Sequence, residues 1–193
     1  MRIATIRRHP ERAVPEETAA ILQQGQVAHV AYVRDGAPCV IPHLYHYGPE
    51  APTTLYLHAA PASATIHHMA AGVAVSVSVT LIDGLVFSRS AKYHSANYRS
   101  VVLSGKTRIV ADNTEKEAIF ERMITRYFPG RTVDEDYAPA EIEHLRAVTV
   151  IAVDIEEWSG KARRGGPKGP LDDDPEAPGT SGVVDLAHDT PGR

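Results

Sequence analysis

The pattern of hydrophobic and polar residues along the chain predicts a protein built mainly from β-strands. Residues 73–80 (VAVSVSVT) alternate apolar and small polar side chains without a break, which is the period of a strand with one buried face. Further runs rich in β-forming residues occupy 27–33, 39–47, 54–58, 98–110 and 148–155. This spacing predicts a mainly antiparallel sheet of six or seven strands, closed as a small barrel.

A few short helices are expected on the outside of this barrel. Pro15 followed by two acids predicts a helix start, and Gly25 ends that helix. Ser63 is typical of an N-cap for a second helix, and an apolar stripe predicts a third helix across 114–127. A short acidic helix is expected at 139–146.

The 193 residues suffice for one sizeable domain. We expect a basic, proline-containing N-terminal arm at 1–14 and a folded domain at 15–160. A Gly/Pro-rich C-terminal tail at 161–193 either hangs free or packs on the barrel or a dimer.

Composition narrows the function classes. The net charge of −4 gives no global basic field for binding nucleic acid or an anionic membrane surface. No apolar run reaches membrane-spanning length or resembles a leader. The single cysteine, Cys39, cannot form an internal disulfide, which fits a reducing compartment. Together these features predict a cytoplasmic protein.

A polar segment at 88–100 lies between the apolar runs 81–87 and 101–103. A hairpin loop needs only Gly, Asn or Asp to turn, whereas this one carries two Arg, a Lys, a His and two Tyr. These residues favour an anionic or aromatic ligand, and the alternative is a solvated polar loop. Just before it, Asp83-Gly84 predicts a bulge or a turn.

Pro42 interrupts the predicted strand 39–47. Because proline cannot donate to a strand ladder, its position indicates a sheet edge, a bulge or a gap that faces a ligand.

Other common chemistries lack their motifs. Ten histidines raise the question of a metal, but no HExxH or Cys/His quartet occurs, so we expect no metal site. The glycine-rich fingerprints of Rossmann and P-loop proteins are missing, and so is a nucleophile elbow. No residue is singled out as a catalytic acid or base.

Three blocks, CVIPHLYHY, LYLH and VSVSVTLIDGLVFSRSAKYHSANYRSVVLSGKTRIV, together resemble the pyridoxamine 5′-phosphate oxidase-like flavoproteins. Within them they resemble the flavin-nucleotide-binding branch that is related to nitroimidazole resistance reductases. The resemblance implies an antiparallel split β-barrel that homodimerises and binds FMN at the subunit interface. It further implies an FMN-dependent oxidoreductase that reduces a small organic acceptor, with NAD(P)H as a possible donor, rather than a true pyridoxamine phosphate oxidase.

The resemblance and the chemistry of FMN together select the candidate cofactor residues. Backbone groups around Pro42 suit the edge of the flavin ring, and arginines, hydroxyls and a helix N-terminus suit its phosphate. The two basic candidates beyond the last core strand match the basic residues that follow this strand in the branch. The full set is Pro42, His43, Leu44, Tyr45, His58, Ser63, Thr65, Arg89, Ser90, His94, Tyr98, Arg99, Ser100, Lys161 and Arg163.

One departure from the branch affects the phosphate site. Relatives commonly read Ser-Arg-x-Leu-Arg after LYLHG, whereas here Ala64 and His67 replace the two arginines. Flavin affinity must then depend more on Arg89, Arg99 or Lys161, or it is weaker than in relatives. Two other functions stay open at this point, a flavin carrier or sensor without turnover and a haem-binding split barrel.

Overall fold

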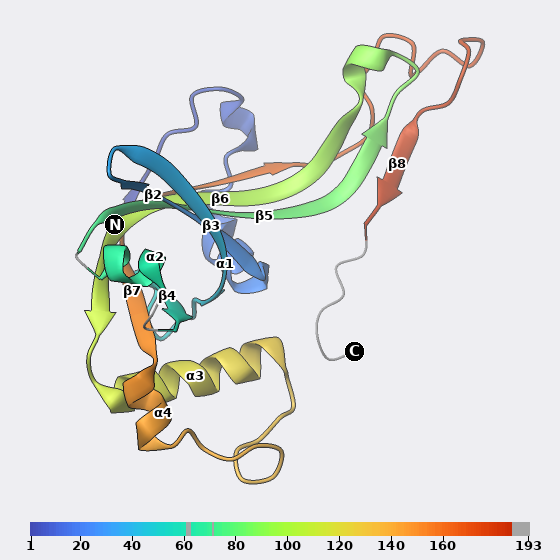
Figure 1. Cartoon of the computed structure of the whole chain (residues 1–193). Helices are drawn as coiled ribbons and strands as arrows, with labels where there is room; N and C mark the ends of the chain where they lie inside the picture. The colour runs from blue at the N-terminus through green and yellow to red at the C-terminus, as the bar shows by residue number, and fades with distance from the viewer. Residues whose placement is uncertain (61–62, 71, 187–193) are drawn as a thin grey trace.

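A computed structural model describes residues 1–60, 63–70 and 72–186. In these residues eight strands form one sheet, and four α-helices and three short 3-10 turns surround it (Figure 1). The strands are β1 (Arg2–Ile3), β2 (Val27–Arg34), β3 (Ala37–His46), β4 (Thr54–Ala59), β5 (Ala74–Phe87), β6 (Ser95–Val110), β7 (Thr149–Arg163) and β8 (Gly182–Asp185). The helices are α1 (Thr18–Gln24), α2 (Ala64–Met69), α3 (Asn113–Tyr127) and α4 (Ile142–Ala147), and the 3-10 turns are η1 (Pro10–Arg12), η2 (Pro15–Glu17) and η3 (Ala91–Tyr93).

The sheet closes on itself as a ring. Its strand order is β1-β7-β4-β3-β2-β5-β6, and a long antiparallel pairing of β6 with β7 completes the circle. All pairings around the ring are antiparallel, and only the two-residue β1 joins β7 in parallel. The expected mainly β split barrel with short peripheral helices is thereby confirmed.

The split lies between β3 and β4. These two strands share only the pairs Tyr45↔Leu57 and His46↔Tyr56, whereas β3 pairs with β2 over its whole length from Ala37 to Leu44. Within the described part of the chain, residues 37–44 of β3 therefore have a neighbouring strand on one side only. Pro42, which sits in this stretch, occupies an open sheet edge, which is one of the three positions that its missing N–H indicated.

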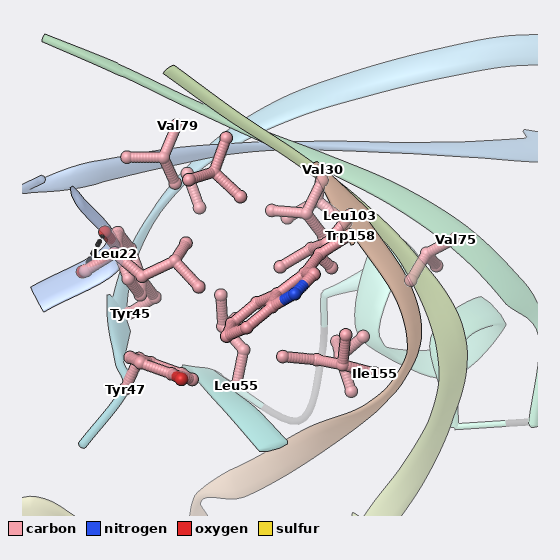
Figure 2. Close-up of a cluster of buried hydrophobic side chains, with 14 of the residues drawn as sticks. Leu22, Val30, Tyr45, Tyr47, Leu55, Val75, Val79, Leu103, Ile155 and Trp158 are labelled. Carbon is pink, nitrogen blue, oxygen red and sulfur yellow. Dashed lines mark hydrogen bonds between the residues drawn. The ribbon is translucent and has the colours of Figure 1, made fainter. Parts of the chain in front are cut away.

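The barrel interior holds the main hydrophobic core (Figure 2). Side chains from β2, β3, β4, β5, β6 and β7 meet there, and Leu22 of α1 and Trp158 of β7 close it. A smaller cluster joins α3 to the outer side of the sheet through Ile119 and Met123 against Tyr56. The alternation of residues 73–80 is thus explained, because Val75, Val77 and Val79 all face this interior.

α3 is tied to the open strand by its last turn. The Arg126 guanidinium donates to the carbonyls of Tyr45, Leu22 and Gly25, and it lies 4.3 Å from the centre of the Tyr45 ring. The Tyr127 hydroxyl donates to the Tyr45 carbonyl at 2.8 Å. These bonds fix β3 at the point where its pairing changes from β2 to β4.

The β5–β6 hairpin projects well beyond the barrel (Figure 1). β6 begins at Ser95, so only residues 88–94 form the connecting tip, and the second half of the polar segment 88–100 is strand. A register shift between Ile82 and Gly84 makes Asp83 a bulge residue, which confirms one of the two expectations for this Asp-Gly pair.

The chain after β7 returns along this hairpin. β7 itself continues to Arg163, and β8 pairs with β5 next to the hairpin tip. Asp172 fastens the connection: its carboxylate accepts from the Ser88 hydroxyl at 2.9 Å and from the Arg89 backbone N–H at 2.8 Å. The described part of the tail thus packs against the barrel's projecting strands. In the described residues, no helix is both long and apolar enough to cross a membrane.

Candidate functional site

The candidate cofactor residues fall into two groups that the fold holds apart within one chain. One group lies along the split between β3, β4 and α2, and the other lies along the projecting β5–β6 hairpin and the end of β7. In Figure 1 the hairpin tip stands far from β4 and α2. The chain by itself therefore does not assemble a single site from all the candidates.

At the split, the open edge of β3 carries accessible polar backbone. In an antiparallel pair, residues bond their partner strand with both backbone groups or with neither, in alternation. Because Pro42 has no N–H, the arrangement consistent with its pairing to His29 places Ile41 and His43 in the bonded positions. The backbone groups of Val40, Pro42 and Leu44 then point away from β2 toward the open edge.

Two histidines flank this edge. Burial lowers the pKa of His43 below its usual value, and the nearby His58 lowers it further. Burial also lowers the pKa of His58, whose ring meets Phe120 of α3 edge-on at 5.3 Å between centroids. The His58 Nδ1 atom is buried and has no hydrogen-bond partner among the described residues. Both imidazoles are therefore neutral near pH 7, so a ring nitrogen of each carries a lone pair.

Tyr45 has a structural position. Its side chain is fully buried, its hydroxyl donates to the Leu22 carbonyl at 2.6 Å, and its own N–H donates to the Tyr127 hydroxyl at 3.1 Å. Burial raises the pKa of Tyr45 to about 12. We therefore assign Tyr45 to packing and to anchoring α3, a role that its place beside Pro42 in the sequence did not reveal.

The start of α2 offers two hydroxyls. Ser63 is the N-cap residue but makes no capping bond with its side chain, and the Thr65 hydroxyl accepts from Tyr32 at 3.1 Å. Both residues are half-buried. The Ser63 hydroxyl is thus the group at this end of the helix that stays available to a ligand.

Arg99 finds its anion inside the chain. Its guanidinium binds both carboxylate oxygens of the bulge residue Asp83, with Nη2 to Oδ1 at 2.7 Å and Nε to Oδ2 at 2.9 Å. It also donates to the Gln24 side chain. A half-buried guanidinium needs a negative partner, and here Asp83 supplies it.

Other hairpin candidates are also engaged within the chain. Arg89 donates to the Ala177 carbonyl of the tail, and the Ser90 backbone N–H donates to the Ser88 hydroxyl. The Ser100 hydroxyl donates weakly to the Lys161 carbonyl at 3.4 Å. Tyr98 is half-buried on β6 opposite Arg163, and Lys161 reaches the Arg8 carbonyl of the arm. These residues hold the arm, hairpin and tail together.

A pocket opens where these three segments meet. It has a volume of about 670 Å³ and includes two of the candidates, His94 and Arg163. The remaining lining residues are His9, Glu11, Arg12, Val14, Lys92, Tyr93, Ser95, Ala162, Arg164 and Lys168. None of these ten was a candidate from the sequence, although the basic arm and the basic residues after the last core strand were signals of positive charge. Only the fold shows that these two stretches face each other across the hairpin tip.

Within residues 1–60, 63–70 and 72–186, no three His, Cys, Asp or Glu side chains are grouped so that they could hold an ion.

The family model described as pyridoxamine 5′-phosphate oxidase matches residues 15–162 of the chain. The search of curated proteins found no match to the chain. Among solved structures, the FAD and haem binding protein from Mycobacterium smegmatis is 31% identical, with a TM-score of 0.79 over 90% of this chain and 82% of that one. The flavocytochrome Anf3 from Azotobacter vinelandii is 28% identical, with a TM-score of 0.79 over 95% of this chain and 83% of that one.

A third structure shares the fold. A candidate 5-nitroimidazole antibiotic resistance protein from Bacteroides thetaiotaomicron is 23% identical, with a TM-score of 0.63 over 77% of this chain and 84% of that one. The resemblance drawn from the three sequence blocks is therefore confirmed.

Proposed function

Because the chain belongs to the pyridoxamine 5′-phosphate oxidase family, we propose that it is a flavin-binding oxidoreductase whose cofactor lies along the open edge of β3. The observation that carries the proposal is the unpaired stretch 37–44 of that strand, with Pro42 at its centre. Support comes from the Mycobacterium smegmatis protein and from Anf3, which are an FAD and haem binding protein and a flavocytochrome.

The residues at this edge fit a flavin ring. The ring carries an N–H donor and several acceptor atoms along one edge, and the edge of β3 offers the carbonyl of Pro42 and the N–H of Leu44 in return. Leu44 is 50% exposed and His43 is half-buried, so both can contact a flat ring. When bound, the flavin supplies the electron transfer, and the protein supplies binding and orientation.

FMN and FAD share the flavin ring and the phosphate at the end of its ribityl chain. Among the described residues, the Ser63 hydroxyl before α2 remains available to the phosphate, whereas Ala64 and His67 stand where relatives have arginines. The proposal covers both flavins and a small organic acceptor, with NAD(P)H as the donor.

A second copy of the chain completes the proposed site. The candidate residues lie in two groups that one chain holds apart, and β3 leaves residues such as Val40 at 62% and Leu44 at 50% exposed. A homodimer would cover this apolar surface and bring the hairpin of one subunit to the open edge of the other.

A flavin titration tests the proposal. FMN and FAD are each added to the flavin-free protein, and binding is followed by quenching of flavin fluorescence. We expect Leu44→Arg to weaken binding at least about tenfold, because it places a bulky charge beside the ring edge. Ile109→Arg is the matched control, since Ile109 is similarly exposed at 48% but lies at the far end of β6. Equal affinities for both variants would remove the open edge from the site.

Turnover is tested on the same loaded protein. Bleaching of the flavin absorption by NADPH or NADH under nitrogen, followed by recovery on adding a nitroaromatic acceptor, supports an oxidoreductase. A flavin that binds tightly but is reduced by neither donor supports the carrier or sensor alternative instead.

Haem binding is a second candidate function, favoured by His58. Its buried, unpartnered Nδ1 atom and neutral imidazole suit an axial ligand, and the two relatives above are a haem binding protein and a flavocytochrome. Titration with haemin should produce a shifted Soret band that His58→Ala abolishes and that His67→Ala, an exposed control, leaves unchanged. A band that survives in His58→Ala would exclude His58 as the ligand.

A further inference from the structure

The pocket between the N-terminal arm, the hairpin tip and the segment after β7 is lined predominantly by cations. Five of its lining residues are Lys or Arg, and only Glu11 is acidic. The chain as a whole carries a net charge of −4, so this concentration of positive charge is local. A concave surface of one charge sign attracts ligands of the opposite sign.

Three of these cations are not neutralised by a carboxylate among the described residues. Arg164 is paired with Glu17, and Arg12 lies 3.7 Å from Glu11. Lys92 and Lys168, in contrast, form no ion pair or side-chain hydrogen bond within the described chain. Two exposed ammonium groups are thus left to meet an anion.

Arg163 is the third. Its guanidinium donates to the Asn97 side-chain oxygen and to the carbonyls of Gly165 and Gly166. These acceptors are neutral, so they fix the orientation of the guanidinium without cancelling its charge. An arginine held in this way is prepared to bind a phosphate group.

The walls of the pocket are held in place before any ligand binds. The arm is fastened to β7 by the bond from the Val14 N–H to the Gly160 carbonyl at 3.0 Å and by the Ala13↔Lys161 bridge. At the tip, the Tyr93 N–H donates to the Ser90 carbonyl at 2.9 Å. A preformed site avoids much of the entropic cost of binding.

The pocket also has an apolar part. Val14 and Ala162 are buried beneath it, and the ring of Tyr93 is 40% exposed at its rim. Its volume of about 670 Å³ lies within the range that small-molecule sites occupy. Cations for phosphates together with an aromatic ring for a base are the combination that a nucleotide requires.

We propose that this pocket binds the ADP moiety of a nucleotide, with Lys92, Arg163 and Lys168 on the diphosphate and Tyr93 against the base. The moiety can come from two sources, the ADP half of FAD or the ADP half of a nicotinamide dinucleotide. The proposal does not require flavin at the open edge of β3, and FMN, which lacks the ADP moiety, does not need this pocket.

Calorimetric titration with ADP tests the proposal directly on the full chain. Lys92→Ala and Lys168→Ala should each weaken ADP binding about threefold to tenfold, because each removes one charge from the diphosphate. Lys106→Ala, which changes another exposed lysine that lies on β6, is the matched control and should leave the affinity unchanged. Tyr93→Ala should weaken ADP but not inorganic pyrophosphate, which has no base.

The two sources are separated by titrating FAD, FMN and NADPH into the same variants. If the pocket variants bind FAD more weakly and FMN as tightly as the wild type, FAD is the source of the ADP moiety. If they bind only NADPH more weakly, the nicotinamide dinucleotide is the source. Failure of ADP to bind the wild-type protein overturns the proposal, and so does an equal effect of Lys106→Ala and the pocket variants. If neither FMN nor FAD binds while ADP does, the flavin proposal falls and this one stands.

Discussion

The guanidinium of Arg99 and the carboxylate of Asp83 form a two-point ion pair across neighbouring strands, with contacts of 2.7 and 2.9 Å. Asp83 is the bulge residue of β5, and its own carbonyl accepts from the Leu186 N–H of the tail at 2.9 Å. Their side chains are 26% and 18% exposed for Asp83 and Arg99. The Asp83 side chain therefore joins β5 to β6 at the base of the projecting hairpin, and the Asp83 carbonyl joins the hairpin to the tail.

Removing either partner of this pair should destabilise the fold. Asp83→Ala leaves a half-buried guanidinium without its anion, and we expect a loss of about 1.5–3 kcal/mol in the free energy of unfolding. In a double-mutant cycle with Arg99→Ala, measured by urea denaturation, the two losses should not add, with a coupling of at least about 1 kcal/mol. Additive losses would show that the ion pair between the two side chains does not stabilise the fold.

Gly160 should tolerate no side chain. A Cβ at this position would lie 2.8 Å from the Val14 carbonyl and against the Thr18 hydroxyl, where the arm and α1 cross β7. Gly160→Ala should therefore cost about 1–3 kcal/mol in thermal or urea unfolding, since the backbone of the arm must move. Gly166→Ala is the control, because nothing lies within 4 Å of its Cβ position. If both variants unfold alike, the arm is not packed as described.

The anchor of α3 depends on Arg126. Arg126→Met keeps an apolar side chain beside the Tyr45 ring but removes three hydrogen bonds to backbone carbonyls. We expect a loss of about 2–4 kcal/mol in the free energy of unfolding. Arg122→Met on the exposed face of the same helix should change it by less than about 1 kcal/mol, because Arg122 only approaches Glu50 at 3.9 Å. A comparable loss in both variants would contradict the anchoring role.

Stability should decrease in mild acid because of His43 and His58. Burial lowers the pKa of both imidazoles in the folded protein below the ordinary value of 6.5. As the pH falls below 6.5, the unfolded chain therefore binds protons that the folded protein does not, and the free energy of unfolding decreases. The slope per imidazole is at most about 1.4 kcal/mol per pH unit, and it vanishes above about pH 7.5.

Urea titrations at pH 5, 6, 7 and 8 measure this dependence. His58→Gln should flatten the curve between pH 5 and 7, while His29→Gln, an exposed position on β2, should leave its shape unchanged. A curve of His58→Gln that parallels the wild type would place the acid sensitivity elsewhere.

The sequence indicated the barrel well because its strands are defined by local signals. The alternation of 73–80 and the position of Pro42 each indicate a local constraint that the fold obeys. The structure of the polar segment 88–100 was harder to predict. Its second half forms strand through pairing with β5 and β7, and no hydrophobic alternation in the sequence indicates that pairing.

The candidate site was also less predictable, because it too depends on contacts between residues that are distant in the sequence. Whether Arg99 binds a ligand or Asp83 depends on the strand register and on the bulge at Asp83. Neither feature can be predicted from the residues that neighbour Arg99 in the sequence. The basic pocket depends on the arm and the segment after β7 lying side by side, a contact between residues about 150 positions apart, as in the bond from Lys161 to Arg8. Such juxtapositions follow only from the closed topology.

The absorption spectrum of the purified protein is the most direct test of its proposed flavin-binding function. We expect flavin bands, either as isolated or after addition of FAD or FMN and removal of the excess by gel filtration, and retention should be lower in Leu44→Arg than in Ile109→Arg. A colourless protein that retains neither flavin would contradict the account.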